Sequence, residues 1–170
     1  MSIVKKIEST LKKLNYKFQS PPILVGGGAL EYYKIRKTGH DFDLIISNKD
    51  KVQLLKNEEK YKKFGFKFNK FGGVTCEDVD CTINFNKIHL DLIVSLYQYK
   101  YSFFNKGAIK IGNIKIASLE NVLFLKTLAI VSPTGAVKHR KDVKLIIEEI
   151  YRKQYPKLEK YPKVPNITIK

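Results

Sequence analysis

The sequence predicts an α/β (α+β) protein in which one mixed β-sheet is flanked by helices. Three observations support this fold class. Apolar residues recur at helical spacing in some segments and form short strand-like runs in others, and the two kinds of segment follow one another along the chain. Glycine and proline clusters separate the segments. The 170 residues, 44% of them hydrophobic, are enough for one domain with its own core.

The N-terminal half is expected to alternate helices with strands. Ile3, Ile7 and Leu11 recur at helical spacing and predict an amphipathic surface helix over residues 2–16. A short apolar run entered through two prolines predicts a buried strand over residues 21–27. The segments expected next are a two-turn helix at 29–36, a strand at 41–47, and a helix at 48–63 that begins with Asn48 as its cap.

The second half is richer in strands and ends in helices. Residues 64–73 and 82–96 predict neighbouring antiparallel strands, and residues 108–117 predict a hairpin that turns at Gly112 and Asn113. The helices expected after the hairpin are 118–131, capped by Ser118, and 136–153, with a break at 132–135. We therefore expect a single domain over 1–153 and a basic tail rich in proline and lysine over 154–170.

The charge of the chain points to anionic partners. The formal net charge is +16, and 29 of the 32 basic residues are lysines. A surface this positive attracts polyanions, so nucleic acid is the favoured partner, with nucleotides and a membrane surface as alternatives. No apolar run approaches the roughly 18 residues of a membrane span, and the N-terminus lacks the apolar stretch of a signal peptide. An intracellular, cytoplasmic protein without a membrane partner is expected.

Three aspartates form a candidate metal site. Asp41 and Asp43 are two residues apart at the start of a strand, so both carboxylates project from one face and repel each other unless a cation binds. Asp91 lies between leucines in a later strand, where a carboxylate needs a cation partner. If the two strands are neighbours, the three acids could hold two divalent ions about 3.5–4 Å apart. Mg²⁺ is the expected metal, with Mn²⁺ as the alternative. The simpler interpretations are a solvated Asp pair and a lysine partner for Asp91.

A glycine cluster precedes the first of these strands. Gly26, Gly27 and Gly28 follow a buried strand and lead into a helix. Glycine allows positive φ and lets backbone N–H groups approach an anion, and a helix N-terminus adds partial positive charge. The segment is a candidate phosphate cradle, although the motifs of a P-loop and of a dinucleotide-binding fold are both absent.

The segments "LVGGGALEYYKIRKTGHDFDLIIS" and "IHLDLIVS" together resemble the nucleotidyltransferase superfamily, whose fold is shared with the palm of DNA polymerase beta. The resemblance implies that Gly26 and Gly27 hold a triphosphate and that Asp41 and Asp43 bind two Mg²⁺ ions. It further implies that Asp91 binds the second metal and activates the incoming hydroxyl. Many members carry serine at the second turn position, where this chain has glycine.

The resemblance covers residues 23–94, and the C-terminal half shows a further similarity. There the helix lysine Lys126 and the pair Lys141–Asp142 are similar to a pattern in minimal and abortive-infection toxin nucleotidyltransferases. This similarity implies that Lys126 and Lys141 contact phosphate and that Asp142 holds a base. The alternatives are that Lys126 extends to solvent and that residues 138–141 are a solvated basic turn. Thr38 is a secondary candidate for a hydrogen bond to phosphate. His40 and His89, the latter two residues before Asp91 and so on the same strand face, are secondary candidates for nucleotide contact, with a structural or solvated role as the simpler interpretation.

These observations predict an enzyme, a metal-dependent nucleotidyltransferase that moves a nucleoside monophosphate from an NTP, ATP among them, to a hydroxyl acceptor. The charge favours RNA or tRNA as the acceptor. One alternative is a toxin/antitoxin-type enzyme that nucleotidylates a protein. Another is a catalytically inactive nucleic-acid-binding module. The net charge argues against an antibiotic-modifying transferase, for which an acidic aminoglycoside pocket would be expected.

Overall fold

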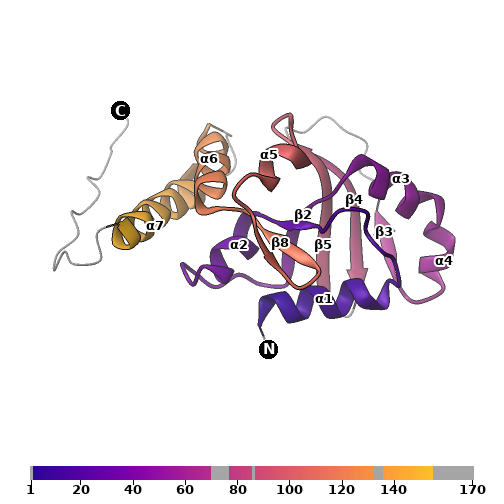
Figure 1. Cartoon of the computed structure of the whole chain (residues 1–170). Coiled ribbons are helices and arrows are strands. Elements are labelled where there is room, and N and C mark those ends of the chain that lie inside the picture. Colours follow the sequence, from indigo (N-terminus) through magenta and orange to yellow (C-terminus); the bar gives the residue numbers. More distant parts are fainter. Residues whose placement is uncertain (1, 70–76, 86, 132–135, 155–170) are drawn as a thin grey trace. The chain divides into compact units, whose positions relative to one another are not determined.

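The computed structural model describes residues 2–69, 77–85, 87–131 and 136–154 (Figure 1). The chain divides into two compact units, residues 1–118 and the residues from 119 onward. The single domain expected over 1–153 stays a prediction, and residues 155–170 of the expected tail lie outside the described residues. Among the helices of the described ranges, none has the length and apolar character that crossing a bilayer requires.

The first unit combines short helices with all of the described strands. Its helices are α1 (Ile3–Lys13), α2 (Gly26–Tyr32), α3 (Asn48–Lys56), α4 (Glu58–Lys62) and α5 (Tyr101–Asn105). Its strands are β1 (Ile23–Leu24), β2 (Asp41–Ile45), β3 (Lys67–Asn69), β4 (Glu77–Phe85), β5 (Ile88–Leu96), β6 (Tyr99–Lys100), β7 (Ile109–Ile111) and β8 (Ile114–Ile116). The helices of the second unit are α6 (Leu119–Ile130) and α7 (Ala136–Gln154).

The strands form one mixed sheet in the order β3-β4-β5-β2-β1-β8-β7, and β6 pairs with β5 (Figure 1). The central pair β2–β5 is parallel, β1 pairs antiparallel with β2, and β1 pairs parallel with β8. The predicted antiparallel neighbours are present as β3, β4 and β5, and the predicted hairpin is β7–β8, although β4 begins at Glu77, five residues before the predicted segment. The predicted fold class, a mixed sheet flanked by helices, is confirmed.

Helix α1, which lies beside α2, contributes one apolar face to the core of the first unit. The apolar face of α1 is buried through Ile3, Ile7 and Leu11, while its lysines lie on the opposite side. Ser2 caps the helix by accepting a hydrogen bond from the Lys5 N–H. Burying each leucine or isoleucine contributes about 1.5–3 kcal/mol, so a helix of three turns is stabilised chiefly by burial of its apolar face.

Several boundaries differ from the sequence prediction. Helix α2 begins at Gly26 and ends at Tyr32, so the glycines form its first turn instead of preceding it. The helix expected over 48–63 is interrupted at Asn57, whose φ of −105° and ψ of 16° separate α3 from α4. Ser47, not Asn48, caps α3, because the Ser47 hydroxyl accepts the Asp50 N–H at 3.1 Å. The sequence analysis missed α5 and β6, and the segment 132–135 lies outside the described residues.

A buried carboxylate fixes α3 to the segment between α1 and β1. Asp50 has no solvent exposure. Its Oδ1 accepts hydrogen bonds from the Tyr16 hydroxyl and the Gln19 N–H, each at 2.8 Å, and its Oδ2 accepts one from the Ser47 hydroxyl at 2.6 Å. Burial and the hydrogen bond to Asp50 raise the pKa of Tyr16. Three donors therefore satisfy a charge that would otherwise be costly to bury.

Replacing Asp50 by Ala is expected to lower the free energy of unfolding by about 2–4 kcal/mol, because three donors lose a charged acceptor inside the protein. Urea denaturation measures the loss. The control is Lys49→Ala, a substitution at the neighbouring exposed residue. It is expected to change the free energy of unfolding by no more than about 0.5 kcal/mol. Equal stability of the two variants would contradict the role assigned to Asp50.

Candidate functional site

The register of two parallel strands brings the predicted acids together. In the β2–β5 pair, Asp43 is the partner of Asp91, and Asp41 is the partner of His89. Paired residues of neighbouring strands lie about 4.8 Å apart across the ladder and project from the same face of the sheet. Segments separated by more than 40 residues therefore place their polar side chains on one surface, as the sequence analysis expects if the strands are neighbours.

The pattern of burial shows which face this is. Along β2 the alternating residues Phe42 and Leu44 are buried, and Leu90 and Leu92 are buried in the same register on β5. The acids occupy the other positions of both strands, and 20% of the Asp91 side chain remains exposed. The apolar face of the two strands packs in the core, and their polar face stays open to ligands.

A histidine joins the acids on this face. The Nε2 atom of His89 lies 3.1 Å from Asp91 Oδ1 and 3.8 Å from Asp41 Oδ1. One donor atom from each of these residues falls within 4.8 Å of the others, which is close enough for a single cation to contact all three. The sequence analysis placed His89 on the same strand face as Asp91 but favoured a structural role. Its place beside Asp41 follows from the register of β2 and β5, and this register cannot be read from the sequence unless the two strands are known to pair.

The glycine turn lies against the second acid. The Val25 N–H donates to the Asp43 carbonyl at 3.0 Å, which fixes the chain just before the turn. Gly26 has a φ of +59°, and a Cβ atom at this position would overlap Asp43 Oδ2. Both the backbone conformation and the close approach therefore require glycine. The structure thus places the predicted phosphate cradle directly beside the predicted metal ligands.

Two polar side chains surround the next glycine. A Cβ atom on Gly27 would lie 2.9 Å from Thr38 Oγ1 and 3.5 Å from Arg36 Nη2. The Thr38 N–H donates to Glu31 Oε2 at 2.6 Å, so α2 holds this loop in place. A serine side chain at position 27 would therefore be crowded by the Thr38 hydroxyl. The sequence analysis named Thr38 as a secondary candidate and missed Arg36.

The first turn of α2 adds backbone donors at the same place. Its N-cap residue is Val25, whose side chain has no hydrogen-bonding atom. The early N–H groups of a helix have no carbonyl partner within the helix, and they carry partial positive charge. The arrangement therefore combines backbone donors, a guanidinium and a hydroxyl on one side with carboxylates on the other. Such a site suits an anionic ligand that also carries a metal ion.

The remaining predicted site residues belong to the second unit. Lys126 on α6 and Asp142 on α7 form a buried ion pair with 3.1 Å between Nζ and Oδ2, and Lys126 Nζ lies 3.5 Å from His139 Nδ1. Lys141 is exposed. Lys126 thus meets an anion of its own helix pair and does not simply extend to solvent. The contacts expected from Lys126, Lys141 and Asp142 to a nucleotide stay predictions.

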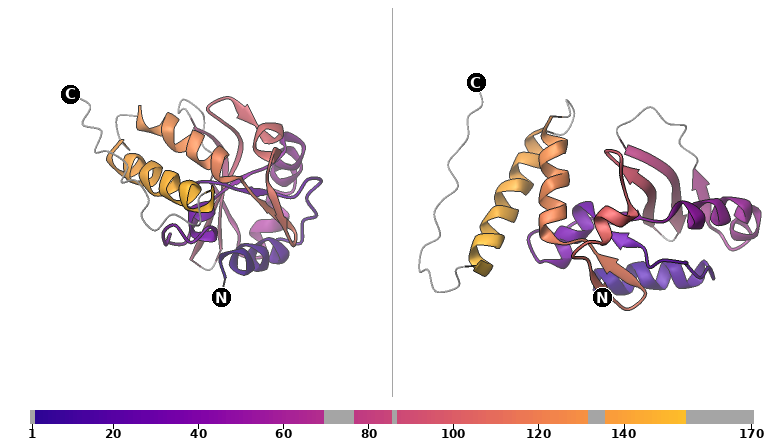
Figure 2. Two further views of the ribbon diagram at one scale, coloured as in Figure 1. Left: turned by 60° about the vertical axis from the view of Figure 1, so that its left-hand side comes forward. Right: turned by 45° about the horizontal axis from the view of Figure 1, so that its top comes forward.

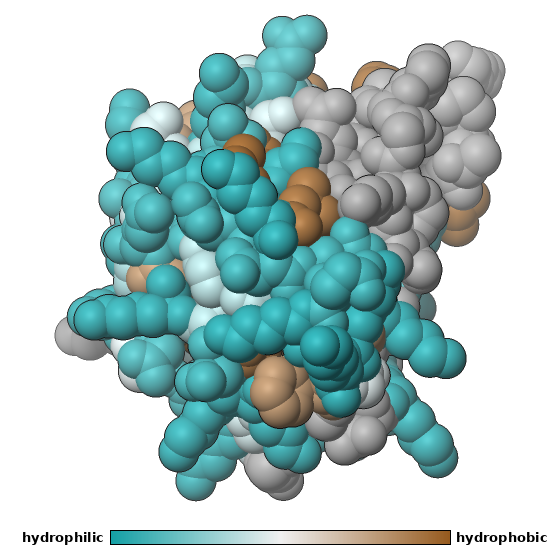
Figure 3. Space-filling model, turned by 90° about the vertical axis from the view of Figure 1, so that its right-hand side faces the viewer, coloured by the Kyte–Doolittle hydropathy of each residue, from teal (hydrophilic) through white to brown (hydrophobic). Residues whose placement is uncertain are grey.

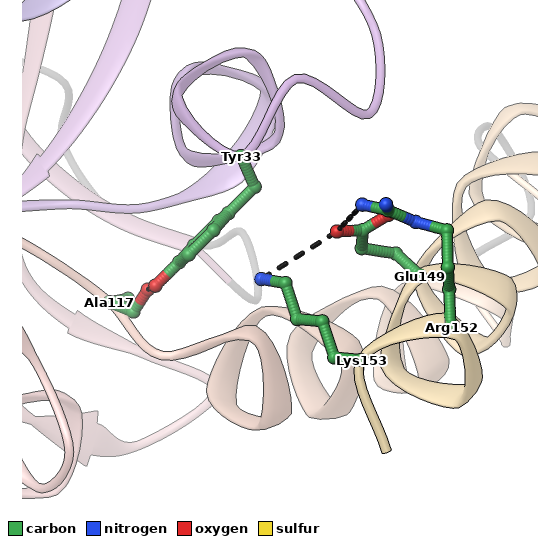
Figure 4. A network of polar contacts seen from close by, with 5 residues as sticks. All are labelled: Tyr33, Ala117, Glu149, Arg152 and Lys153. Atoms are coloured by element: carbon green, nitrogen blue, oxygen red, sulfur yellow. Dashed lines mark hydrogen bonds and ion pairs between the residues drawn. The ribbon is translucent and has the colours of Figure 1, made fainter. Parts of the chain in front are cut away.

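Further polar contacts hold each unit together separately (Figure 4). In the first unit, the Tyr33 hydroxyl donates to the Ala117 carbonyl at 2.9 Å, which ties the end of α2 to the residue after β8. In the second unit, Glu149 accepts two hydrogen bonds from Arg152 along α7, and Lys153 lies 3.7 Å from the same carboxylate. The Tyr33 contact positions the helix that begins at the glycine turn.

Comparison with solved structures identifies the architecture. The crystal structure of ANT(2'')-Ia in complex with adenylyl-2''-tobramycin aligns with a TM-score of 0.56 and 15% sequence identity, covering 92% of this chain and 94% of that chain. The solution structure of the same antibiotic-resistance factor gives a TM-score of 0.52 and 16% identity, with coverages of 92% and 93%. The chain has the nucleotidyltransferase fold.

The nucleotidyltransferase fold accounts for the sequence resemblance over residues 23–94 and confirms the predicted architecture. No protein-family model matches the chain, and a search of curated proteins found no match. At 15–16% identity the likeness to ANT(2'')-Ia shows the fold alone. The finer similarity to abortive-infection toxin enzymes stays a prediction.

Replacing Gly26 by Ala is expected to reduce nucleotide binding at least tenfold, since the new Cβ strains a φ of +59° and displaces the Asp43 carboxylate. Isothermal titration with a non-hydrolysable NTP measures the change. Gly39→Ala is the matched control, because a Cβ there meets nothing within 4 Å. If both substitutions leave binding unaltered, the glycine turn does not serve as the cradle.

Proposed function

We propose that this protein transfers a nucleoside monophosphate from an NTP to a hydroxyl acceptor and releases pyrophosphate. The observation that supports this function most strongly is the pairing of Asp43 with Asp91 beside the turn at Gly26. Phosphoryl transfer requires that the reactants be positioned and that developing charge be stabilised. In this fold, acids at these positions can serve both purposes.

The side chains of the site fit a divalent cation. Asp41 and Asp91 offer hard carboxylate oxygens, and His89 offers a ring nitrogen within the same 4.8 Å group. Mg²⁺ binds through a few carboxylates together with substrate phosphates, which suits an open site of this kind, and Mn²⁺ suits the same ligands. Two divalent ions, when bound, would neutralise developing charge and align the hydroxyl with the α-phosphorus.

The residues of the chain divide the remaining work. Asp41 and Asp43 would hold the metal ions, and Asp91 would hold the second of them and accept the proton of the acceptor hydroxyl. The N–H groups of Gly26 and Gly27 bind the triphosphate, together with the Thr38 hydroxyl and the Arg36 guanidinium beside them. In the second unit, the proposed phosphate contacts are Lys126 and Lys141, and the proposed base contact is Asp142.

Nucleic acid, as RNA or tRNA, is the acceptor that we propose. The net charge of +16 attracts a polyanion at long range. An aminoglycoside acceptor, which the adenylyl-tobramycin complex of ANT(2'')-Ia brings into consideration, is a polycation and would be repelled by the same field. A protein acceptor is the further alternative. Incubation with α-labelled NTPs, total RNA, tobramycin and cell protein in parallel shows which acceptor becomes labelled.

Asp41→Asn and Asp43→Asn are each expected to lower turnover roughly a thousandfold, because loss of a metal ligand removes several kcal/mol of transition-state stabilisation. Transfer of label from the NTP is the readout. The folded structure should persist, and circular dichroism checks this. Glu59→Gln removes a carboxylate of which 83% of the side chain is exposed and should leave turnover unchanged. Full activity in both aspartate variants would exclude the proposed function.

His89→Ala is expected to weaken Co²⁺ binding roughly tenfold or more and Mg²⁺ binding much less, because imidazole nitrogen is a better ligand for later transition metals than for Mg²⁺. Isothermal titration of each metal measures the two affinities. The control is His40→Ala, which removes a neighbouring histidine outside the Asp41–His89–Asp91 group. Unchanged Co²⁺ binding in the His89→Ala variant would mean that His89 is not a ligand.

A further inference from the structure

A cavity of about 420 Å³ lies in the first unit, and none of the acids of β2 and β5 lines it. It is lined by α1, by the segment that leads from α1 to β1, and by the β7–β8 hairpin, and these elements lie side by side (Figure 2). The Asn113 N–H donates to Glu8 Oε1 at 2.7 Å and so joins the hairpin to α1. The volume is within the range of sites that bind small molecules or single groups of a larger ligand.

The charge of the cavity favours an anion. Lys12, Lys17 and Lys110 line it from three different segments, and all three are exposed. The acidic residue of the lining, Glu8, already accepts the hydrogen bond from Asn113. Three ammonium groups around one hollow produce a local positive potential, which is the electrostatic arrangement expected for binding a phosphate backbone.

Two aromatic rings in the same lining favour a nucleic acid over a simple anion. Tyr16 and Phe18 contact each other edge to face, with 4.8 Å between ring centroids. The Tyr16 hydroxyl is held by Asp50, which fixes the position of the pair. Bases of a single strand stack on such rings, whereas the bases of a duplex are already stacked on each other.

The cavity is separate from the polar face of β2 and β5 that carries the acids. Pro21 lines it just before β1, and Gly26 follows the other end of the same strand. Five residues of extended chain span roughly 16 Å. A ligand in the cavity therefore leaves the acids of β2 and β5 free for an NTP.

We propose that this cavity binds single-stranded nucleic acid, with a base against Phe18 and with phosphates against Lys12, Lys17 and Lys110. The proposal goes beyond the transferase function and does not depend on it. Binding is therefore measured in EDTA without NTP, so that failure here leaves the proposed function untouched. Success would supply an anchoring site for the acceptor strand.

The absence of tryptophan from the sequence offers a site-specific probe. Phe18→Trp introduces a single fluorophore in the lining, and stacking of a base should quench its emission when an oligoadenylate of about 12 nucleotides is added. Phe64→Trp places the matched fluorophore at a position that is 59% exposed and lies at the end of α4, and its emission should not change. Inorganic polyphosphate, which has no bases, should compete for the site without quenching.

Salt dependence tests the lysines independently of the ring. The triple variant Lys12→Gln, Lys17→Gln, Lys110→Gln should reduce the slope of log K against log salt by about 2, since each phosphate contact to a single strand contributes roughly 0.7. A matched triple variant removes the same charge from the face of α3 and α4, which is largely hydrophilic (Figure 3). The exposed lysines substituted there are Lys56, Lys60 and Lys63. This control should change the slope by less than about 1.

Three results would overturn the proposal. The first is an unquenched Phe18→Trp protein under conditions where the strand binds. The second is an equal loss of slope in both lysine triples, which would assign binding to the general surface charge. The third is saturation of the Phe18→Trp signal by AMP at the same concentration as the oligonucleotide, which would make the cavity a site for free nucleotides.

Discussion

The parallel pairing of β2 with β5 is the constraint on which the candidate site depends. It sets Asp43 opposite Asp91 and Asp41 opposite His89, although the two strands are far apart in sequence. A shift of one residue would turn Asp91 toward the core and expose Leu90 or Leu92 on the polar face. The buried residues of both strands therefore specify the register, and the register in turn brings the polar groups together. The core of the sheet and the chemistry of the site depend on the same apolar residues.

The glycine turn extends this constraint to the ligand side of the site. Gly26 approaches Asp43 so closely that no side chain fits, and Gly27 lies against Thr38 and Arg36. The loop after α2 thus brings a hydroxyl, that of Thr38, next to the second glycine of the turn. That loop is held to α2 through Glu31. The glycine turn, this loop and Asp43 therefore lie next to one another, just after β1.

Much of this arrangement is predictable from sequence because it depends on local patterns. The alternation in β2 places Asp41 and Asp43 on one face, and the apolar neighbours of Asp91 identify it as an unusual strand residue. His89 and Arg36 could not be assigned in the same way, because their roles depend on contacts across strands and loops. The sequence analysis placed the start of α2 after the glycines because glycine has low helix propensity. Low propensity matters less in the first turn of a helix, where the N–H groups have no partner within the helix.

Other differences have equally specific causes. Ser47 caps α3 in place of Asn48 because its hydroxyl accepts a hydrogen bond from the Asp50 N–H and donates one to the Asp50 carboxylate. Serine and asparagine are both common caps, so residue type alone does not decide between two neighbours. The sequence analysis gave Lys126 and Asp142 separate ligand contacts, whereas the structure pairs them. This ion pair depends on how α6 and α7 pack against each other. The spacing of apolar residues within each helix does not show which of its residues face those of the other.

We propose that divalent cations and an NTP bind together between the acids of β2 and β5 and the turn at Gly26. Anomalous scattering from crystals grown with Mn²⁺ and a non-hydrolysable NTP tests it most directly. Manganese peaks are expected in contact with Asp41, Asp43 and Asp91, with the triphosphate at the N–H groups of Gly26 and Gly27. A nucleotide bound elsewhere, or manganese that avoids these three carboxylates while nucleotide is present, would contradict it.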